Sequence, residues 1–199
     1  MSTDRYWGAN LSDTSDLVAG QTWEYDAQGN MLTKSINGAL LEQNTYDILN
    51  RLIARAITGK GSISYTYDAV GNILTFTDQQ SGITRYAYDL LNRMTALTDP
   101  DNKTTAYIYD SLGRRTKRTY PNGCVSAYAY DAKSELVTVS NLGPRREVIS
   151  SYSYLYDRAG KRTRMSEPDK ITDYSYDRKS QLTGAETSRQ RGRFRTERL

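Results

Sequence analysis

The sequence predicts an all-β protein built from tandem repeats of about 21 residues, each consisting of a strand, a turn and a second strand. Three observations support this prediction. A Tyr-Asp pair recurs at a fixed interval, an alternating aromatic pattern precedes the pair, and turn-forming residues follow it. The strands are expected to form one antiparallel sheet, because short turns join neighbours in sequence, and an open sheet of this length is expected to curl.

Eight Tyr-Asp pairs define the repeat. The first six are spaced by 21 residues, the next interval is 26 and the last is 20. Fourteen of the 17 tyrosines belong to this motif, so the high tyrosine content is first of all a structural feature. The pairs are Tyr25-Asp26, Tyr46-Asp47, Tyr67-Asp68, Tyr88-Asp89, Tyr109-Asp110, Tyr130-Asp131, Tyr156-Asp157 and Tyr176-Asp177.

The first strand of most repeats has the pattern Tyr-x-Tyr. Side chains two residues apart project from the same face of a strand, so both rings should lie on one face of the sheet. Aromatic residues suit a half-buried pleated surface, and a ladder of such rings could pack repeat on repeat or stack against sugar rings. The candidate ladder consists of Tyr65, Tyr67, Tyr86, Tyr88, Tyr107, Tyr109, Tyr128 and Tyr130.

An aspartate ends each first strand and begins a turn. Its carboxylate can accept a hydrogen bond from the backbone N–H two residues on. Three residues after the aspartate stand Gly29, Asn50, Gly71, Asn92, Gly113, Ser134, Gly160 and Ser180. Glycine and asparagine tolerate the left-handed backbone that tight hairpins require. The predicted turn aspartates are Asp26, Asp47, Asp68, Asp89, Asp110, Asp131, Asp157 and Asp177.

The second strand of each repeat begins two residues later, with an apolar residue in six repeats and with Arg115 or Arg162 in the other two. This position is therefore expected to be only half-buried. A second set of turns is predicted at Asn37-Gly38, Gly59-Lys60-Gly61, Ser81-Gly82, residues 99–102 and residues 121–123. The 26-residue interval contains an insertion over residues 141–147. It is expected to lengthen one surface turn by about five residues, with a recognition loop as the alternative.

The frame at Tyr65–Ile73 and at Tyr86–Met94 resembles the YD-repeat family, also called the Rhs repeat. The resemblance covers residues 21–185. It implies a long β-sheet strip that spirals into a hollow shell, of the kind that encloses bacterial toxins. It also implies extracellular or cell-surface proteins that take part in cell contact and carbohydrate binding. An enclosed toxin, or further repeats of a parent protein, would then be the partner.

Two departures from the family pattern affect that implication. Eight repeats form a short array. The self-cleaving core segment of toxin-associated members is missing, because Asp99-Pro100 is followed by Asp101-Asn102 and lies within a repeat turn. Autoproteolysis is therefore not expected of this chain.

Three segments are predicted: an N-terminal lead or cap at 1–20, the repeat array at 21–185, and a basic, disordered tail at 186–199. The excess of basic residues lies at the C-terminal end, and a solvated end is a better interpretation of the tail than a nucleic-acid site, since Phe194 is its single aromatic residue. No signal-peptide pattern is visible, and no apolar stretch approaches the roughly 18 residues of a membrane span.

The composition argues against most catalytic chemistry. There is no histidine, so histidine-based triads are excluded, and Cys124 alone can form neither an intrachain disulfide nor a cysteine metal site. No cofactor is expected. The repeated aspartates are better explained as turn formers than as a hydrolase pair or a calcium ladder, because each occupies the same position in its repeat.

The sequence therefore favours a non-enzymatic structural or encapsulating repeat module. A carbohydrate-binding module that uses the tyrosine ladder is the alternative, and an aspartate hydrolase is a further one. An open sheet of this length has two edges and uncovered faces, so association between copies through an edge or a face is also expected.

Overall fold

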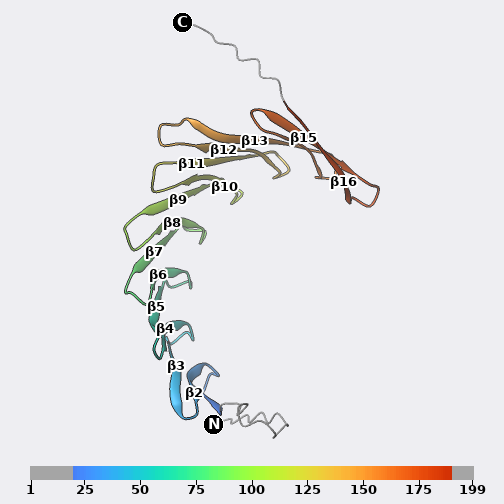
Figure 1. Cartoon of the computed structure of the whole chain (residues 1–199). Helices are drawn as coiled ribbons and strands as arrows, with labels where there is room; N and C mark the ends of the chain where they lie inside the picture. The colour runs from blue at the N-terminus through green and yellow to red at the C-terminus, as the bar shows by residue number, and fades with distance from the viewer. Residues whose placement is uncertain (1–19, 190–199) are drawn as a thin grey trace. The chain divides into compact units, whose positions relative to one another are not determined.

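The computed structural model describes residues 20–189. Within that range the chain contains sixteen β-strands and no helix (Figure 1). The predicted all-β fold of tandem strand–turn–strand repeats is confirmed. Residues 1–19 of the expected lead and residues 190–199 of the expected tail lie outside the described residues. Residues 186–189, which were expected to begin the tail, instead complete the last strand.

The chain divides into two units, and the division falls between Lys103 and Thr104. The strands of the first unit are β1 (Gln21–Tyr25), β2 (Met31–Ile36), β3 (Ala39–Tyr46), β4 (Leu52–Ile57), β5 (Gly61–Tyr67), β6 (Ile73–Thr77), β7 (Ile83–Tyr88) and β8 (Met94–Thr98). Those of the second unit are β9 (Thr104–Tyr109), β10 (Arg115–Thr119), β11 (Val125–Tyr130), β12 (Leu136–Leu142), β13 (Val148–Tyr156), β14 (Arg162–Ser166), β15 (Lys170–Tyr176) and β16 (Leu182–Arg189).

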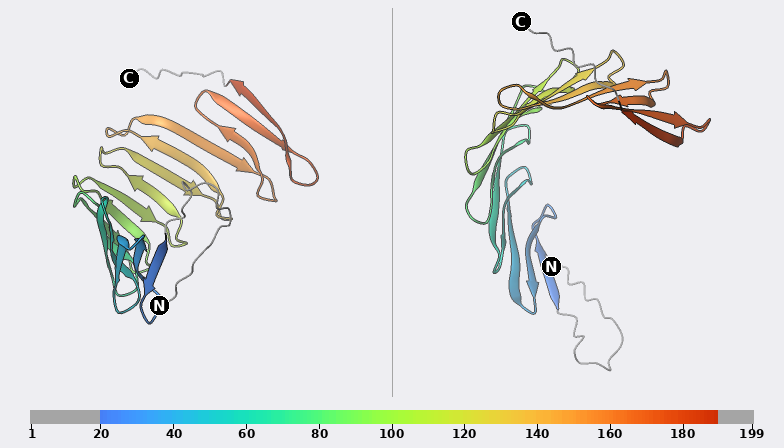
Figure 2. Two further views of the ribbon diagram at one scale, coloured as in Figure 1. Left: turned by 60° about the horizontal axis from the view of Figure 1, so that its bottom comes forward. Right: turned by 45° about the horizontal axis from the view of Figure 1, so that its top comes forward.

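Within each unit the strands lie side by side in chain order and pair antiparallel (Figure 2). Every turn is therefore a hairpin. Within each unit, the turns that follow a Tyr-Asp pair all lie at one end of the strands, and the other turns lie at the opposite end. These two rims, formed by turns, are distinct from the edge strands of the sheet. We call these the YD edge and the opposite edge.

Each hairpin on the YD edge has the same backbone geometry. In the third repeat, Gly71 N–H donates to the carbonyl of Asp68 at 3.3 Å, and Asp68 N–H donates to the carbonyl of Asn72 at 2.9 Å. This is a type I turn followed by a left-handed residue, which suits a three-residue hairpin loop. All eight residues at the third position after the aspartate have positive φ, from 58° at Asn92 to 99° at Gly71.

A register shift accompanies these turns. Tyr65 pairs with Phe76 but Tyr67 pairs with Ile73, so the second strand carries one extra residue there. Such a bulge places Ile73 and Phe76, three residues apart, on the same face. Simple alternation along the strand would place them on opposite faces.

The insertion at residues 141–147 does not enlarge a loop, contrary to the sequence-based expectation. Instead β12 and β13 are long strands of 7 and 9 residues. Their turn has the ordinary form, with Arg146 N–H donating to Gly143 at 2.9 Å and Gly143 N–H donating to Glu147 at 2.8 Å. The added residues pair with each other across the hairpin, because a paired backbone satisfies its own hydrogen bonds.

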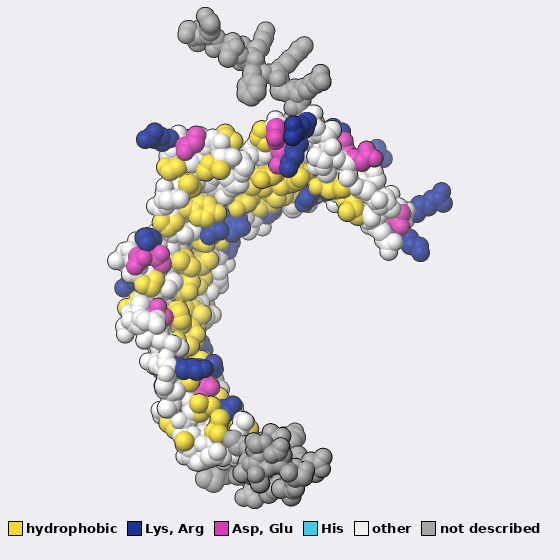
Figure 3. All heavy atoms as spheres, in the orientation of Figure 1, with side chains coloured by type: hydrophobic (Ala, Val, Ile, Leu, Met, Phe, Trp, Pro, Cys, Tyr) yellow, Lys and Arg dark blue, Asp and Glu magenta, His cyan; other side chains and the backbone are white. Residues whose placement is uncertain are grey.

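The described residues contain no fully buried hydrophobic side chain. The interior side chains are half-buried tyrosines and aliphatic residues on one face of the sheet, which we call the tyrosine face. Figure 3 shows apolar side chains exposed along the sheet in both units. The few buried side chains are polar: Asn44, Thr105, Ser126 and Thr172. No helix in the described part is long and apolar enough to cross a membrane.

Candidate functional site

In five repeats the tyrosine of the Tyr-Asp pair forms a hydrogen bond to the repeat before it. Tyr67 Oη donates to the carbonyl of Leu52 at 2.7 Å. The same bond, from the hydroxyl to the first residue of the preceding second strand, recurs in both units. It joins Tyr46 to Met31 at 3.1 Å, Tyr130 to Arg115 at 3.0 Å, Tyr156 to Leu136 at 2.8 Å and Tyr176 to Arg162 at 2.8 Å.

The first tyrosine of the Tyr-x-Tyr segments makes different contacts. Tyr65 packs against Tyr67 and Phe76, with ring centroids 6.4 Å and 5.3 Å away. Its hydroxyl forms no hydrogen bond within residues 20–189, and the same holds for Tyr86, Tyr107 and Tyr128. All eight tyrosines of the predicted ladder are half-buried, with Tyr65, Tyr67, Tyr86 and Tyr88 in the first unit and Tyr107, Tyr109, Tyr128 and Tyr130 in the second.

The turn aspartates use their carboxylates to hold the hairpins. Asp68 Oδ1 accepts from Val70 N at 3.0 Å and from Asn72 N at 2.8 Å, while Oδ2 accepts from Asn72 Nδ2 at 2.8 Å. The Asn72 side chain, with the backbone N–H groups, lowers the pKa of Asp68. A carboxylate held ionised in this way is poorly suited to act as a general acid.

The residue four positions after the aspartate links consecutive turns. Arg51 Nε donates to Asp47 Oδ2 at 2.7 Å and its Nη1 donates to the carbonyl of Asp68 in the next turn at 2.8 Å. Its guanidinium carbon also lies 4.6 Å from the ring centroid of Tyr67. We call this arrangement the turn clip. Arg114 forms it as well, with Asp110, the carbonyl of Asp131 and the ring of Tyr130.

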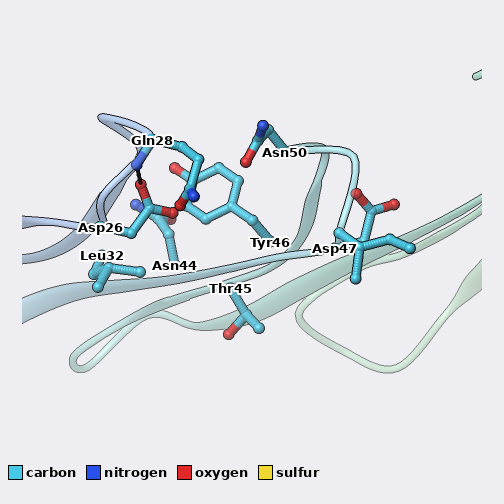
Figure 4. A pocket seen from close by; sticks show the side chains of 9 residues that line it. Asp26, Gln28, Leu32, Asn44, Thr45, Tyr46, Asp47 and Asn50 are labelled. Carbon is cyan, nitrogen blue, oxygen red and sulfur yellow. Dashed lines mark hydrogen bonds between the residues drawn. The ribbon is translucent and has the colours of Figure 1, made fainter.

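A polar cluster around the buried Asn44 lies on the tyrosine face of the first unit. Arg55 pairs with Glu42 Oε1 at 3.1 Å and donates to Asn44 Oδ1 at 3.1 Å. Asn44, which is 3% exposed, donates to the carbonyl of Met31 at 3.1 Å. In Figure 4, Asn44 and Tyr46 project to one side of β3 and Thr45 to the other. They border an open depression of about 710 Å³ near the turns of Asp26 and Asp47.

A second polar group lies on the tyrosine face of the second unit. Ser126 Oγ donates to Asn141 Oδ1 at 2.6 Å, and Asn141 Nδ2 donates to Ser150 Oγ at 2.9 Å.

Beside this row, Arg115 and Arg118 lie against tyrosine rings. Sequence reasoning singled out Arg115 only as a departure from an apolar position and missed Arg118. The sequence signal for Arg118 was its position three residues after Arg115, at the start of a second strand where the register shift places both side chains on one face.

A row of exposed aliphatic side chains runs along the YD edge of the first unit. Ile48 and Leu90 are 99% and 103% exposed, and Leu49, Val70 and Leu91 are largely exposed. We call these five residues the apolar turn row. Leu112 is the corresponding residue of the second unit. The sequence carried the signal as pairs of aliphatic residues directly after the turn aspartates.

The described residues contain no group of three or more potential metal-ligating side chains. Cys124 is a free, half-buried thiol. What the described residues do present are half-buried tyrosine rings and the exposed side chains of the apolar turn row.

Comparisons with known proteins place this geometry in a family. A family model described as the teneurin YD-shell matches residues 12–197. The chain belongs to this family. The resemblance to YD repeats that the Tyr-Asp pairs indicated is thereby confirmed. No curated protein matches the chain in sequence.

Solved structures share the YD-shell fold with this chain. A Tc holotoxin pore of Photorhabdus luminescens and the complexes TcdB2–TccC3 and TcdB2–TccC3–Cdc42 each superpose with a TM-score of 0.61 at 16% sequence identity. The similarity covers 83% of this chain but only 12% of each of those chains. At this identity the similarity shows only that the fold is shared. This chain spans a small part of the length of those proteins.

Proposed function

We propose that this chain is a non-enzymatic wall segment of a YD-repeat shell. Its sheet would be covered by another polypeptide or by further repeats. The observation that carries the proposal is the absence of any buried hydrophobic side chain among residues 20–189, combined with the exposed apolar turn row. Large exposed apolar surfaces mark interaction sites in soluble proteins. The turn clips and tyrosine hydroxyls join neighbouring hairpins, and within each unit residues 20–189 supply no second layer of strands or helices on either face of the sheet.

The wall would form part of a secreted bacterial protein, toxin-associated or at the cell surface, and would enclose a toxin polypeptide or continue into further repeats. Membership of the YD-shell family and the shared fold of toxin complexes support this proposal. Apolar side chains at hairpin tips favour contact with another polypeptide, because leaving them in water costs about 25 cal/mol per Å².

Sedimentation velocity on the purified 199-residue chain, with far-UV circular dichroism alongside, tests the proposal. We expect a β-rich chain that associates as its concentration rises. Replacing Leu90 and Leu91 together by glutamate should shift the chain toward monomer and leave the β signal unchanged. The matched control replaces Gln79 and Gln80 by glutamate, which adds the same charge to an exposed turn of the opposite edge.

A chain that stays monomeric at every concentration, with a normal β spectrum and no response to the leucine substitutions, would contradict the proposal. Such a result would mean that the sheet is stable in water without cover. Equal effects of the leucine and glutamine variants would assign the association to net charge and would remove the apolar turn row from the argument.

Carbohydrate binding is a second candidate, favoured by the first tyrosine of each pair. These rings are half-buried, and the hydroxyls of Tyr65, Tyr86, Tyr107 and Tyr128 have no hydrogen-bond partner within residues 20–189. A sugar could stack on the ring and bond to the hydroxyl. On a glycan array, Tyr86→Ala should abolish binding, while Arg85→Ala on the opposite face should not. If the folded chain binds no glycan, this candidate is removed.

A further inference from the structure

The strongest unexplained feature of the molecule is a pair of arginines on β10. The bulge of this strand shifts the register between Arg115 and Lys117, and Arg118 pairs with Tyr107 on β9. Arg115 and Arg118 therefore share the tyrosine face although they are three residues apart. Lys117 pairs with Ile108 and lies on the other face.

Both guanidinium groups lie against aromatic rings. The carbon of Arg115 is 5.2 Å from the ring centroid of Tyr128 and 5.8 Å from that of Tyr107. The carbon of Arg118 is 4.4 Å from Tyr120 and 5.7 Å from Tyr107. We call these five residues the Arg–Tyr cluster. Stacking holds a guanidinium in a fixed plane and leaves its edge available for hydrogen bonds.

Neither arginine has an acidic partner among residues 20–189. Arg118 Nε is buried and has no hydrogen-bond partner there. A buried donor without an acceptor is unfavourable, so an acceptor supplied from outside would be favoured. The two acidic residues carried by strands β9–β16 are Asp173 and Glu186, which lie opposite each other on β15 and β16 and on the other face of the sheet. Asp173 is already paired there with Arg164 at 2.6 Å.

The first unit shows which partner this position takes. Arg55 occupies the place in the second repeat that Arg118 occupies in the fifth, three residues after the start of the second strand. Arg55 is satisfied by Glu42 at 3.1 Å. The residue that corresponds to Glu42 in the fifth repeat is Thr105, which is buried and carries no charge. The carboxylate present in one repeat is thus missing in the other.

We infer that the Arg–Tyr cluster binds carboxylate side chains of an acidic polypeptide segment that lies across the tyrosine face of the second unit. Arg115 and Arg118 bind the carboxylates, and the tyrosine rings pack against the aliphatic parts of the segment. Arg162, whose guanidinium carbon is 4.5 Å from the ring centroid of Tyr154, extends the positive charge along this face. The inference rests on the proposed covering of the sheet by other polypeptide, and it specifies the chemistry of that cover.

Fluorescence anisotropy on the full chain tests the inference. The probe is a fluorescein-labelled peptide of alternating glutamate and alanine, and the control peptide has glutamine in place of glutamate. We expect binding of the glutamate peptide alone, weakened by salt because it is electrostatic. Arg118→Gln should weaken binding by about tenfold, as expected for loss of a charge-assisted pair. Lys117→Gln removes a charge from the same strand on the other face and should change binding less than about twofold.

Thr105→Glu supplies a second test that does not depend on removing an arginine. The new carboxylate should pair with Arg118 as Glu42 pairs with Arg55. We therefore expect this variant to stay folded by circular dichroism, to unfold at a higher temperature than the wild-type chain, and to lose peptide binding.

Several outcomes would overturn the inference. These are equal binding of the glutamine peptide, equal losses for Arg118→Gln and Lys117→Gln, or unchanged binding by Thr105→Glu. Tighter, Arg118-dependent binding of a single-stranded oligothymidylate would assign the cluster to nucleic acid. A chain that binds the peptide through Arg118 but never associates would contradict the proposed wall function and leave the cluster standing.

Discussion

At the scale of single residues, the tyrosine hydroxyls distinguish two roles within one motif. In the third repeat Tyr67, the tyrosine of the Tyr-Asp pair, donates to a backbone carbonyl of the preceding repeat, whereas Tyr65 makes contacts through its ring alone. Burial also raises the pKa of the Tyr67 and Tyr88 phenols, because the charged form is disfavoured there. The same residue type therefore donates a hydrogen bond between repeats at one position and contributes only ring packing two residues earlier.

This difference predicts the effect of removing one oxygen atom. Tyr67→Phe should lower the free energy of unfolding by about 1 kcal/mol, because the hydrogen bond to Leu52 is lost. Tyr65→Phe, the matched control, should cost much less, since its hydroxyl has no partner within residues 20–189. Urea denaturation followed by circular dichroism measures both. Equal costs for the two variants would refute the distinction.

The turn aspartates predict a dependence of stability on acid. Hydrogen bonds from Asn72 lower the pKa of Asp68 in the folded chain, and those from the Arg51 backbone and side chain lower that of Asp47. A lowered folded pKa gives stability that is present above the unfolded value of about 3.9 and is lost as the pH falls through the folded value.

Melting temperatures measured between about pH 6 and pH 2 should therefore fall steeply at the acid end. Asp68→Asn should lower the melting temperature at neutral pH and flatten its fall in acid. Asp101→Asn changes the same charge at an exposed pair with Lys103 and serves as the control. A wild-type curve that stays flat down to pH 2, well below the usual aspartate range, would show that the turn hydrogen bonds contribute nothing to folding.

At the scale of the hairpin, the turn clip shows why the residue after each left-handed position matters. Arg51 and Arg114 each join their own aspartate to the next turn. Glu135 occupies the same position in the sixth repeat. Partial burial and the neighbouring Asp131 carboxyl raise the pKa of Glu135. Its charge is therefore unfavourable at neutral pH, and that penalty is relieved as the pH falls through the raised value.

Replacing this glutamate should repair the clip. Glu135→Arg is expected to raise the melting temperature at neutral pH, because a cation there can pair with Asp131 and reach the turn at Gly160, beside which the Glu135 side chain already lies. Glu135→Gln removes the repulsion without supplying the cation, so it should give a smaller rise. If both variants melt at or below the wild-type temperature, the clip does not stabilise the sixth repeat.

At the scale of the whole molecule, the strands contact only their neighbours in the chain within each unit. Stability in such an array is close to a sum of repeat and nearest-neighbour terms. A destabilising substitution should therefore affect its own repeat and the adjacent repeats, whereas in a domain with one shared hydrophobic core it would affect all strands.

Gly71→Ala tests this property. The φ of Gly71 is 99° and a methyl group there would meet no atom within 4 Å, so the cost is backbone strain of about 1–2 kcal/mol. Gly71→Asn should cost less, because Asn50 and Asn92 adopt positive φ at the same position. Hydrogen exchange should quicken in β5 and β6 and stay unchanged in β12 to β16. Uniform quickening across all strands would indicate a single cooperative unit instead.

The sequence by itself determined the eight repeats, the strand–turn–strand order within each of them, the two sets of turns and the family. These follow from local chemistry: an Asp-x-x-Gly segment forms its turn with its own atoms, and Tyr-x-Tyr places two rings on one face wherever the strand lies. The tertiary structure decided which groups meet across strands. A bulge brings Arg115 and Arg118 to one face, the residue opposite sets whether an arginine finds a carboxylate, and the insertion at 141–147 pairs instead of looping out. Those outcomes depend on register, and a shift of one residue reverses the face of every side chain beyond it.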